Sequence, residues 1–541
     1  MSTNSTVKKN PKKGKVKGAS KWKSKLIAIL VAAFFVLSIF FYFANSMGLA
    51  ARVLTGANVA GNRVRVNQMN YFYYNILNMY AQYGIIQSEA DLDTVINQET
   101  GETYRGYFRR TAAESWQQII ITERRMMEAG YQPVTAERAA NESIDSIRAT
   151  ASAQGMTADQ YLMNLYGRGM TVRTAKDIIY REQASQEFAS YLIQNEYNVT
   201  PEEAQSLFDE DPVKYSQHTF NIFFVAAELP KAEEEVPEEG ADPTPTPEVT
   251  PTPTPPVTPS PEAIKDAVAK AQAILDASED GESFLAAAKE AAGEDGAADF
   301  EDDKDPTIKE KQMIADVGTS FGDDVKAFIG DIERKAGDST VIETETGAYA
   351  IFFQSRGTKD DPTVSYRKIS FMIDASSDLT DEEQVEALTQ RLEEIKASVS
   401  DETSFIDAAM RLSDEASGVS GGLVSGATRD SFTLTEDEEK EEEGEDAEAS
   451  EEETEAKEPT FDDLAYAWLF DTSRTGGDMV IIPNVDNDAV TLLFFRNNLP
   501  NWQSVLMSST SSERYNTWFT EQRDLPGNGI SINHGIMSFA S

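Results

Sequence analysis

Ser283-Phe284-Leu285-Ala286-Ala287-Ala288 recurs later in the chain as Ser404-Phe405-Ile406-Asp407-Ala408-Ala409. Each copy is followed at a similar distance by a predicted strand pair. These pairs are Gly337–Ile342 with Ala350–Phe353 in the first copy, and Gly477–Ile482 with Leu492–Phe495 in the second. Motifs that keep their order and spacing over such lengths indicate a duplicated unit. We therefore predict two related small domains in tandem.

The composition excludes several classes of site. The 541 residues carry a formal net charge of −44, which argues against a basic nucleic-acid-binding surface as the main activity. The chain has no Cys, so disulfides, thiolate metal sites, Cys nucleophiles and Cys-linked lipid anchors are excluded. The chain has two histidines, His218 and His534, which are too few for a His-rich metal site and make a Ser-His-Asp triad improbable. We predict no metal ion and no cofactor.

A membrane segment is predicted near the N-terminus. Leu26 to Ala44 is apolar apart from Ser38, and its length suits a helix that crosses a bilayer. Nine lysines and no acidic residue precede it in residues 1–25, so the positive-inside rule places this basic tail in the cytoplasm. A cleaved signal peptide, with a mediocre site at Ala44-Asn45-Ser46, and a buried core helix are the alternatives. We favour an uncleaved single-pass anchor in the cell membrane, with the bulk of the chain extracytoplasmic.

Residues 60–215 carry the hydrophobic spacing of amphipathic helices. Thr200-Pro201-Glu202-Glu203 predicts a further helix start, with Thr as the N-cap and Pro in the first turn. Residues 498–541 add helical sequence and a possible strand at Gly527–Ile532, and we expect them to complete an all-helical domain at 60–215. The predicted helices are Val64–Tyr83, Thr111–Ala129, Ala136–Gln154, Gln160–Tyr166, Val172–Tyr197, Trp502–Leu506 and Ser512–Arg523.

Two α+β domains are predicted at 218–357 and 363–497. Each begins with a strand and continues with helical sequence, a Gly-containing loop, a short helix and the closing strand pair. A Pro- and Thr-rich stretch at 243–261 interrupts the first domain, and we expect an extended linker, with an SH3-type ligand as the alternative. An acidic run at 436–458, with fifteen Asp and Glu, interrupts the second and is predicted to be disordered.

The motifs of both regions resemble known families. Val64-Arg65-Val66-Asn67-Gln68-Met69-Asn70-Tyr71-Phe72 resembles the opening of SurA-type N-terminal chaperone domains. The two repeats resemble parvulin-type peptidyl-prolyl isomerase domains, and the resemblance rests on the order of the motifs rather than on any single one. In the second copy the motifs are Val364–Ser370, Ser404–Asp414, Gly421-Gly422-Leu423 and Pro459–Asp478. The likeness covers most of the chain after residue 60.

This resemblance implies a multidomain α and α+β protein: a transmembrane helix, a SurA-type helical chaperone domain and two tandem parvulin-like domains. It also implies an extracytoplasmic folding factor, like SurA, PrsA-like lipoproteins or membrane-anchored parvulin relatives. The lack of Cys argues against the lipoprotein form. The implied partners are unfolded or nascent exported polypeptides. We favour a chaperone or foldase that holds such chains, with an active prolyl isomerase and a non-catalytic cell-surface scaffold as alternatives.

Parvulins carry two histidines in the floor of the sheet, and this chain has lost both positions. The aligned residues are Lys368 and Val490 or Thr491 in the second copy, and Asn221 and Tyr349 in the first. His218 lies about three residues upstream of the expected place. We expect it to be an exposed histidine at a strand edge, and we expect His534 to face solvent. No residue is therefore assigned as catalytic, and the resemblance leaves isomerase activity open.

The apolar pocket that the family uses for proline is better preserved. Phe461 stands at the pocket-Phe position, and the other candidates lie near it in the sequence or at matching places in the first copy. The alternative is that these aromatic rings only form the hydrophobic core. For Trp468 and Phe470 the sequence supports the pocket and the core equally. Because the acidic run ends just before Pro459, we expect it to emerge at the pocket rim. The candidates are Phe461, Phe432, Trp468, Phe470, Phe321 and Phe328.

Overall fold

The computed structural model describes residues 48–230, 258–293, 300, 305–435, 459–484 and 488–540. The predicted basic tail, the predicted span at 26–44, the acidic insert at 436–458 and most of the Pro-rich insert lie outside these residues. Within them, no helix is both long enough and apolar enough to cross a membrane. The fold mixes helices with four small antiparallel sheets. The chain divides into two compact units, residues 1–193 with 514–541, and residues 194–513.

The first unit contains the helices that the sequence predicts. Its longest, α4 (Tyr104–Ala129), begins earlier than predicted because the Thr103 side chain accepts a hydrogen bond from the Gly106 N–H. It ends at Gly130, whose φ of 67° suits the left-handed C-cap. The other helices are α2 (Leu49–Val53), α3 (Val66–Gln82), α5 (Ala136–Ala153), α6 (Ala158–Tyr166) and α7 (Val172–Asn195).

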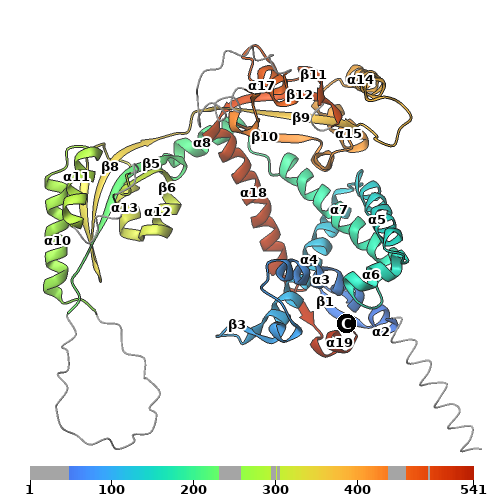
Figure 1. The fold of residues 1–541 in the computed structure, drawn as a ribbon, viewed down its shortest axis with the longest axis horizontal. Helices are drawn as coiled ribbons and strands as arrows, with labels where there is room; N and C mark the ends of the chain where they lie inside the picture. The colour runs from blue at the N-terminus through green and yellow to red at the C-terminus, as the bar shows by residue number, and fades with distance from the viewer. Residues whose placement is uncertain are drawn as a thin grey trace, which may run out of the picture. The chain divides into compact units, whose positions relative to one another are not determined.

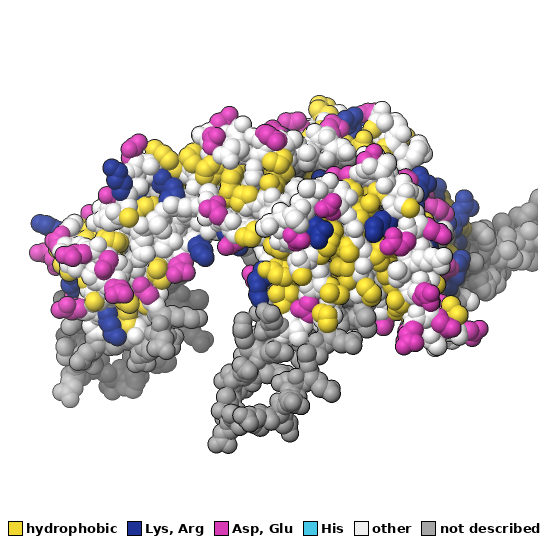
Figure 2. All heavy atoms as spheres, turned by 90° about the horizontal axis from the view of Figure 1, so that it is seen from above, with side chains coloured by type: hydrophobic (Ala, Val, Ile, Leu, Met, Phe, Trp, Pro, Cys, Tyr) yellow, Lys and Arg dark blue, Asp and Glu magenta, His cyan; other side chains and the backbone are white. Residues whose placement is uncertain are grey.

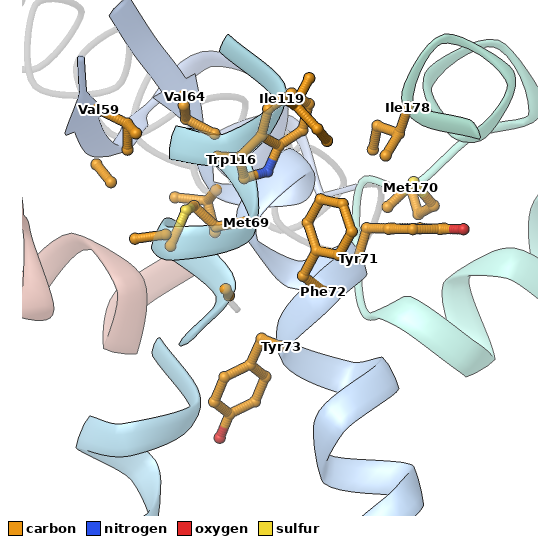
Figure 3. Close-up of a cluster of buried hydrophobic side chains, with 14 of the residues drawn as sticks. Val59, Val64, Met69, Tyr71, Phe72, Tyr73, Trp116, Ile119, Met170 and Ile178 are labelled. Atoms are coloured by element: carbon orange, nitrogen blue, oxygen red, sulfur yellow. The ribbon is translucent and has the colours of Figure 1, made fainter. Parts of the chain in front are cut away.

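The core of the first unit forms around Trp116. Its ring is fully buried and meets the ring of Phe72 edge-to-face, with centroids 5.7 Å apart (Figure 3). The Trp116 indole N–H donates to the Gln68 backbone carbonyl, which satisfies its one polar group. Arg181 covers the ring, with its guanidinium carbon 4.8 Å from the centroid. A single aromatic core therefore joins α3, α4 and α7.

The prediction that this region is all-helical is wrong. β1 (Thr55–Val59), β2 (Asn62–Arg65) and β13 (Ile530–Ile532) form an antiparallel sheet in the order β13-β1-β2. β3 (Val95–Asn97) pairs with β4 (Glu102–Thr103) in a second small sheet. These strands have two to five residues, too few for an alternating pattern to be recognised. The predicted strand near the C-terminus is confirmed as β13, and its pairing with β1 completes the first unit.

The two helices predicted at 502–523 form one uninterrupted helix, α18 (Asn501–Asp524; Figure 1). The Ser- and Thr-rich stretch at 508–512 predicts a break because these residues are weak helix formers. Packing on both sides overrides that tendency. Leu506 is buried with α8 (Pro201–Glu210), and Trp518 packs against the core of the first unit. A short helix, α19 (His534–Ala540), follows β13.

α8 starts as predicted, since the Thr200 side chain accepts from the Glu203 N–H and Pro201 stands in the first turn. The predicted boundary at residue 215 differs from the structure, because the division between the units falls after Ile193. The two α+β domains therefore belong to the same unit as α8 and α9 (Pro212–Tyr215).

Both α+β domains have the same sheet order, β6-β5-β8-β7 in the first and β10-β9-β12-β11 in the second. The prediction missed one strand in each, β6 and β10. β6 carries the charged run Lys309-Glu310-Lys311, and β10 is short and contains Gly426. The first domain contains β5 (Gln217–Ala226), α10 (Pro261–Asp276), α11 (Gly281–Ala292), β6 (Ile308–Met313), α12 (Ile314–Phe321), α13 (Asp323–Ile329), β7 (Ser339–Thr344) and β8 (Gly347–Gly357). The second contains β9 (Pro362–Met372), α14 (Asp381–Ser398), α15 (Glu402–Leu412), β10 (Leu423–Ala427), α17 (Phe461–Leu469), β11 (Met479–Asn484) and β12 (Ala489–Pro500).

The repeat extends to individual contacts. Asp280 caps α11 by accepting from the Ser283 N–H at 2.8 Å, and Asp401 caps α15 in the same way from Ser404. The Gly337 N–H donates to the Phe353 carbonyl at 2.9 Å, as the Gly477 N–H does to Phe495. Arg334 lies over the ring of Phe328, and Arg474 lies over the ring of Trp468. These pairs fix which residues of the two domains are equivalent.

Candidate functional site

The side chains of β9 alternate between two environments in the second domain. Tyr366, Lys368 and Ser370 lie on one face, which we call the α17 face because α17 packs on it. Ile369 and Phe371 lie on the other, where they pack with residues of α14 and α15. The neighbouring strand β12 places Thr491 opposite Ser370 and Leu493 opposite Lys368. Lys368, the residue aligned with a family histidine, therefore stands on the face that also carries the aromatic candidates.

A polar network surrounds Lys368. Its ammonium lies 2.7 Å from a Glu415 carboxylate oxygen, and both side chains are about one-quarter exposed, at 26%. The Ser417 hydroxyl donates to the same oxygen at 3.1 Å. Beneath them the hydroxyls of Ser370 and Thr491, both fully buried, lie 2.8 Å apart. The cation is thus held at the surface, within reach of a ligand.

Glu415 is ionised at neutral pH. Burial raises its pKa, but hydrogen bonds from Lys368, Ser370 and Ser417 outweigh burial and lower it overall. Its backbone is fixed as well, because the adjacent Asp414 N–H donates to the Ser370 carbonyl at 2.9 Å. The network can donate a hydrogen bond from Lys368 and accept one at Glu415. It contains no activated nucleophile.

The aromatic candidates of the second domain lie together on the α17 face. Phe461, Phe432, Trp468 and Phe470 belong to one cluster that also includes Leu493. Tyr466, which the sequence reasoning missed, lies between them, with ring centroids 4.6 Å from Phe470 and 5.8 Å from Phe432. The clustering of the four candidates is thus a feature of the fold.

The exposures of these four rings differ. Phe432 is buried, whereas Phe461, Trp468 and Phe470 keep partial exposure. Trp468 lies under the Arg474 guanidinium at 4.8 Å, and Phe328 of the first domain has the same arrangement with Arg334 at 3.9 Å. The Trp468 position is therefore a shared structural feature of the repeat. Phe461, Tyr466 and Phe470 are the other partly exposed rings of this cluster.

Tyr366 connects the polar network to the aromatic cluster. Burial, followed by the negative charges of Asp462 and Glu415, raises its pKa to about 12. Its ring belongs to the same cluster as Phe461 and lies on the same face of β9 as Lys368. The polar network and the aromatic cluster therefore occupy one face of the sheet.

The corresponding face of the first domain is apolar. Phe321 and Phe328 pack in a cluster with Phe220 and Tyr349, and the Phe321 ring lies 6.0 Å from that of Phe220. Tyr349 pairs with Phe224 across the strands, as Thr491 pairs with Ser370 in the second domain. The first domain thus has an aromatic pair where the second has the buried hydroxyls.

Two of the aligned positions lie on the opposite faces of their sheets. Asn221 is fully buried and donates to Thr307 at 2.8 Å and to Asp305 at 3.1 Å, and it also bonds Gln354. Val490 packs with α14 and α15. Counting from the matched strand pairs, the equivalent of Lys368 is Ile222, not Asn221, because a shift of one residue moves a side chain to the other face. Thr491, not Val490, faces the network.

The structure overturns one expectation about the histidines. His218 is fully buried rather than exposed at an edge, because the missed strand β6 covers that side of β5. Its Nε2 lies 3.1 Å from the Val213 carbonyl. Burial lowers its pKa, the Val213 contact opposes this and the Arg356 charge adds to it. His534 is exposed as predicted, at the start of α19.

Arg367 fixes the loop that carries Glu415. Its guanidinium donates to Glu402 at 2.7 Å, to the carbonyls of Ser420 and Gly421 at 3.0 Å, and to Gln194 at 2.9 Å. The following Gly422 has a φ of 70°, and an added Cβ would lie 2.0 Å from the Lys368 carbonyl oxygen. The predicted Gly-Gly loop is thus required by its close approach to β9.

Asp463 ties together the two ends of the acidic insert. It accepts hydrogen bonds from the backbone and hydroxyl of Thr435 on one side, and of Thr460 on the other. Burial raises its pKa, but these hydrogen bonds outweigh burial and lower it to about 2. Both ends of the insert therefore lie at the first turn of α17, the helix that Phe461 begins. The insert itself lies outside the described residues.

No protein-family model matches this sequence, and no curated protein is significantly similar to it. Among the described residues, no group of three His, Asp or Glu is arranged to hold a metal ion.

Proposed function

We propose that this protein is a membrane-anchored extracytoplasmic folding factor that binds unfolded segments of exported polypeptides. The observation that carries the proposal is the α17 face, which carries both partly exposed aromatic rings and a surface ion pair. Unfolded chains expose apolar side chains next to free backbone amides. The rings offer a surface for the apolar side chains, and the Lys368 ammonium offers a donor to a peptide carbonyl.

The surface of the protein suits this role. Figure 2 shows hydrophobic side chains gathered in patches among many acidic ones on the face that it presents. The net charge of −44 keeps such a surface soluble while apolar patches remain exposed. It also favours cationic or neutral segments over acidic ones as ligands.

Suppression of client aggregation tests the proposal. The full-length chain in lipid nanodiscs is mixed with a chemically unfolded client, and light scattering is followed over time. We expect the wild type to delay aggregation and the Phe461→Ala variant to lose much of the effect. Leu379→Ala is the matched control, because Leu379 is 51% exposed and precedes α14, on the other face of the same sheet. Equal suppression by both variants would refute the assignment of the α17 face.

Prolyl isomerase activity is the second candidate, and the polar network favours it. A catalyst of this reaction needs an apolar pocket and groups that stabilise the twisted amide, but no nucleophile. Lys368 and Glu415 supply a donor and an acceptor on the sheet face that also carries Phe461. NMR exchange spectroscopy on a short X-Pro peptide decides the matter. Cis–trans exchange that accelerates with wild type but not with Lys368→Ala supports an isomerase, and broadening without acceleration leaves a binding domain.

A further inference from the structure

The first unit contains a cavity of about 760 Å³. α3 and α4 form two of its walls, and residues 86–92 and α19 form the others. Its volume lies in the range of small-molecule and cofactor sites. Tyr73 belongs to the same buried cluster as Trp116, and its ring lies apart from the Trp116 ring in Figure 3. The lining includes Asn70, Tyr73, Leu77, Ile86, Glu89 and Arg109.

Arg109 is a buried cation without a carboxylate partner. It is 6% exposed, and its guanidinium donates to the Ser538 hydroxyl at 3.0 Å and to the His534 carbonyl at 3.5 Å. Its Nε has no acceptor, and no acidic side chain of the described residues lies within ion-pair distance. Arg105, one turn earlier on α4, contrasts with it, since Asp93 lies 2.9 Å away. A buried charge of this kind is costly unless something pairs with it.

Asn70 is a second unsatisfied group in the same cavity wall. The side chain is fully buried, and neither its oxygen nor its nitrogen has a hydrogen-bond partner among the described residues. Buried side-chain amides in native proteins are nearly always hydrogen-bonded. Two polar side chains from two helices thus line one cavity: Arg109 leaves its Nε unpaired, and Asn70 leaves both of its side-chain polar atoms unpaired.

We propose that this cavity binds a carboxylate carried on an apolar body. The carboxylate pairs with Arg109, a neighbouring polar group of the ligand bonds Asn70, and the apolar part packs on Leu77, Ile86 and the ring of Tyr73. Glu89 at the rim and Asp93 on Arg105 limit the positive charge, so a single negative charge fits better than a phosphate. Two sources have this chemistry: the C-terminal residue of a polypeptide, and a free organic acid. The first source rests on the proposed function.

Calorimetry on the full-length chain in nanodiscs tests the inference with four probes. These are N-acetyl-leucyl-phenylalanine as the free acid, the same dipeptide as the amide, 3-phenylpropionic acid and inorganic phosphate. We expect the acid to bind at least about tenfold more tightly than the amide, the effect of one charge-assisted hydrogen bond. Phenylpropionate that binds as tightly as the dipeptide acid identifies a free acid as the source, and much weaker binding identifies a chain end. Equal binding of acid and amide, tightest binding of phosphate, or no binding would overturn the proposal.

Variants locate the site. Arg109→Gln is expected to abolish the difference between acid and amide, whereas Arg138→Gln, on α5, leaves it unchanged. Asn70→Leu is expected to raise the unfolding temperature, because it removes a buried amide that has no partner in the protein. The same variant is expected to bind the dipeptide acid more weakly, because the ligand loses its hydrogen bond to that amide. If Arg109→Gln does not fold, the difference in affinity between acid and amide for the wild type still tests whether the cavity binds a carboxylate. Aggregation suppression is measured separately, so dipeptide binding without it would refute the proposed function and leave this site standing.

Discussion

Replacing Arg367 by Met should strongly destabilise the second α+β domain. The guanidinium is 2% exposed and makes four hydrogen bonds, to Glu402, to two backbone carbonyls and to Gln194. Met fills similar space but removes all four hydrogen bonds. Breaking a buried ion pair by removing one partner costs about 3–5 kcal/mol. Glu402 is itself 36% exposed and also contacts Arg496, at 2.5 Å, so its carboxylate keeps water and one partner. The lower end of that range, about 3 kcal/mol, is therefore expected.

Hydrogen–deuterium exchange on the amides of β9 and β12 is the suitable assay, because a chain of several domains does not unfold in one step. A loss of about 3 kcal/mol accelerates exchange of the slowest amides roughly 100-fold. Arg411→Met is the matched control, since Arg411 also lies 2.7 Å from a carboxylate, that of Asp407, but both side chains are more than half exposed. That surface pair should contribute about 0.3–0.5 kcal/mol. Similar effects for the two variants would refute the reasoning that burial makes Arg367 important.

Gly422→Ala should lower the stability of the second domain by more than about 2 kcal/mol and disrupt the Lys368–Glu415 pair. Gly477→Ala should lower it less, because φ is 102° there but no atom lies within 4 Å of the added Cβ. Hydrogen exchange compares the two variants. The lowered pKa of His218 means that the unfolded state binds a proton more readily than the folded state, so the His218 contribution to stability should be complete above about pH 6.5 and fall as the pH drops below it. Local stability measured by exchange of the β5 amides from pH 7.5 to 5 should show this dependence in the wild type and lose it in His218→Gln. The same pH dependence in both proteins would contradict the assignment. Asp280→Ala and Asp401→Ala should each lower the local stability of their helices by about 1 kcal/mol, and clearly unequal losses would argue against equivalent caps.

The sequence predicts well those elements whose signals are local. α3, α5, α6 and α7 begin and end within a few residues of their predicted bounds, and the cap at Thr200 starts α8 as predicted. The repeated Ser-Phe motif places α11 and α15 correctly, since it combines a helix cap with a buried Phe in both copies. Hydrophobic spacing and caps act over a few residues, so they are visible in one sequence.

Elements that depend on distant partners were missed or misplaced. β1 was missed because its partner β13 lies at the other end of the chain. α18 continues through its Ser-rich centre because packing at both ends holds it. Strand register was the hardest feature to predict, because an error of one residue moves a side chain to the other face of the sheet. The sequence alignment chose Asn221 where the structure has Ile222, and it left Val490 and Thr491 open where the structure selects Thr491. Glu415 was overlooked because its role depends on an ion pair with a residue far away in sequence. The four aromatic candidates of the second domain do lie together.

Site-specific cross-linking tests the central claim most directly. A photoreactive amino acid replaces Phe461 in one preparation of the full-length chain and Leu379 in another, and each is irradiated with an unfolded client and with the same client folded. The account predicts cross-links from position 461 to the unfolded client, and few from position 379 or to the folded client. Cross-links of equal yield from both positions, or none from position 461 under conditions where the protein suppresses aggregation, would contradict it.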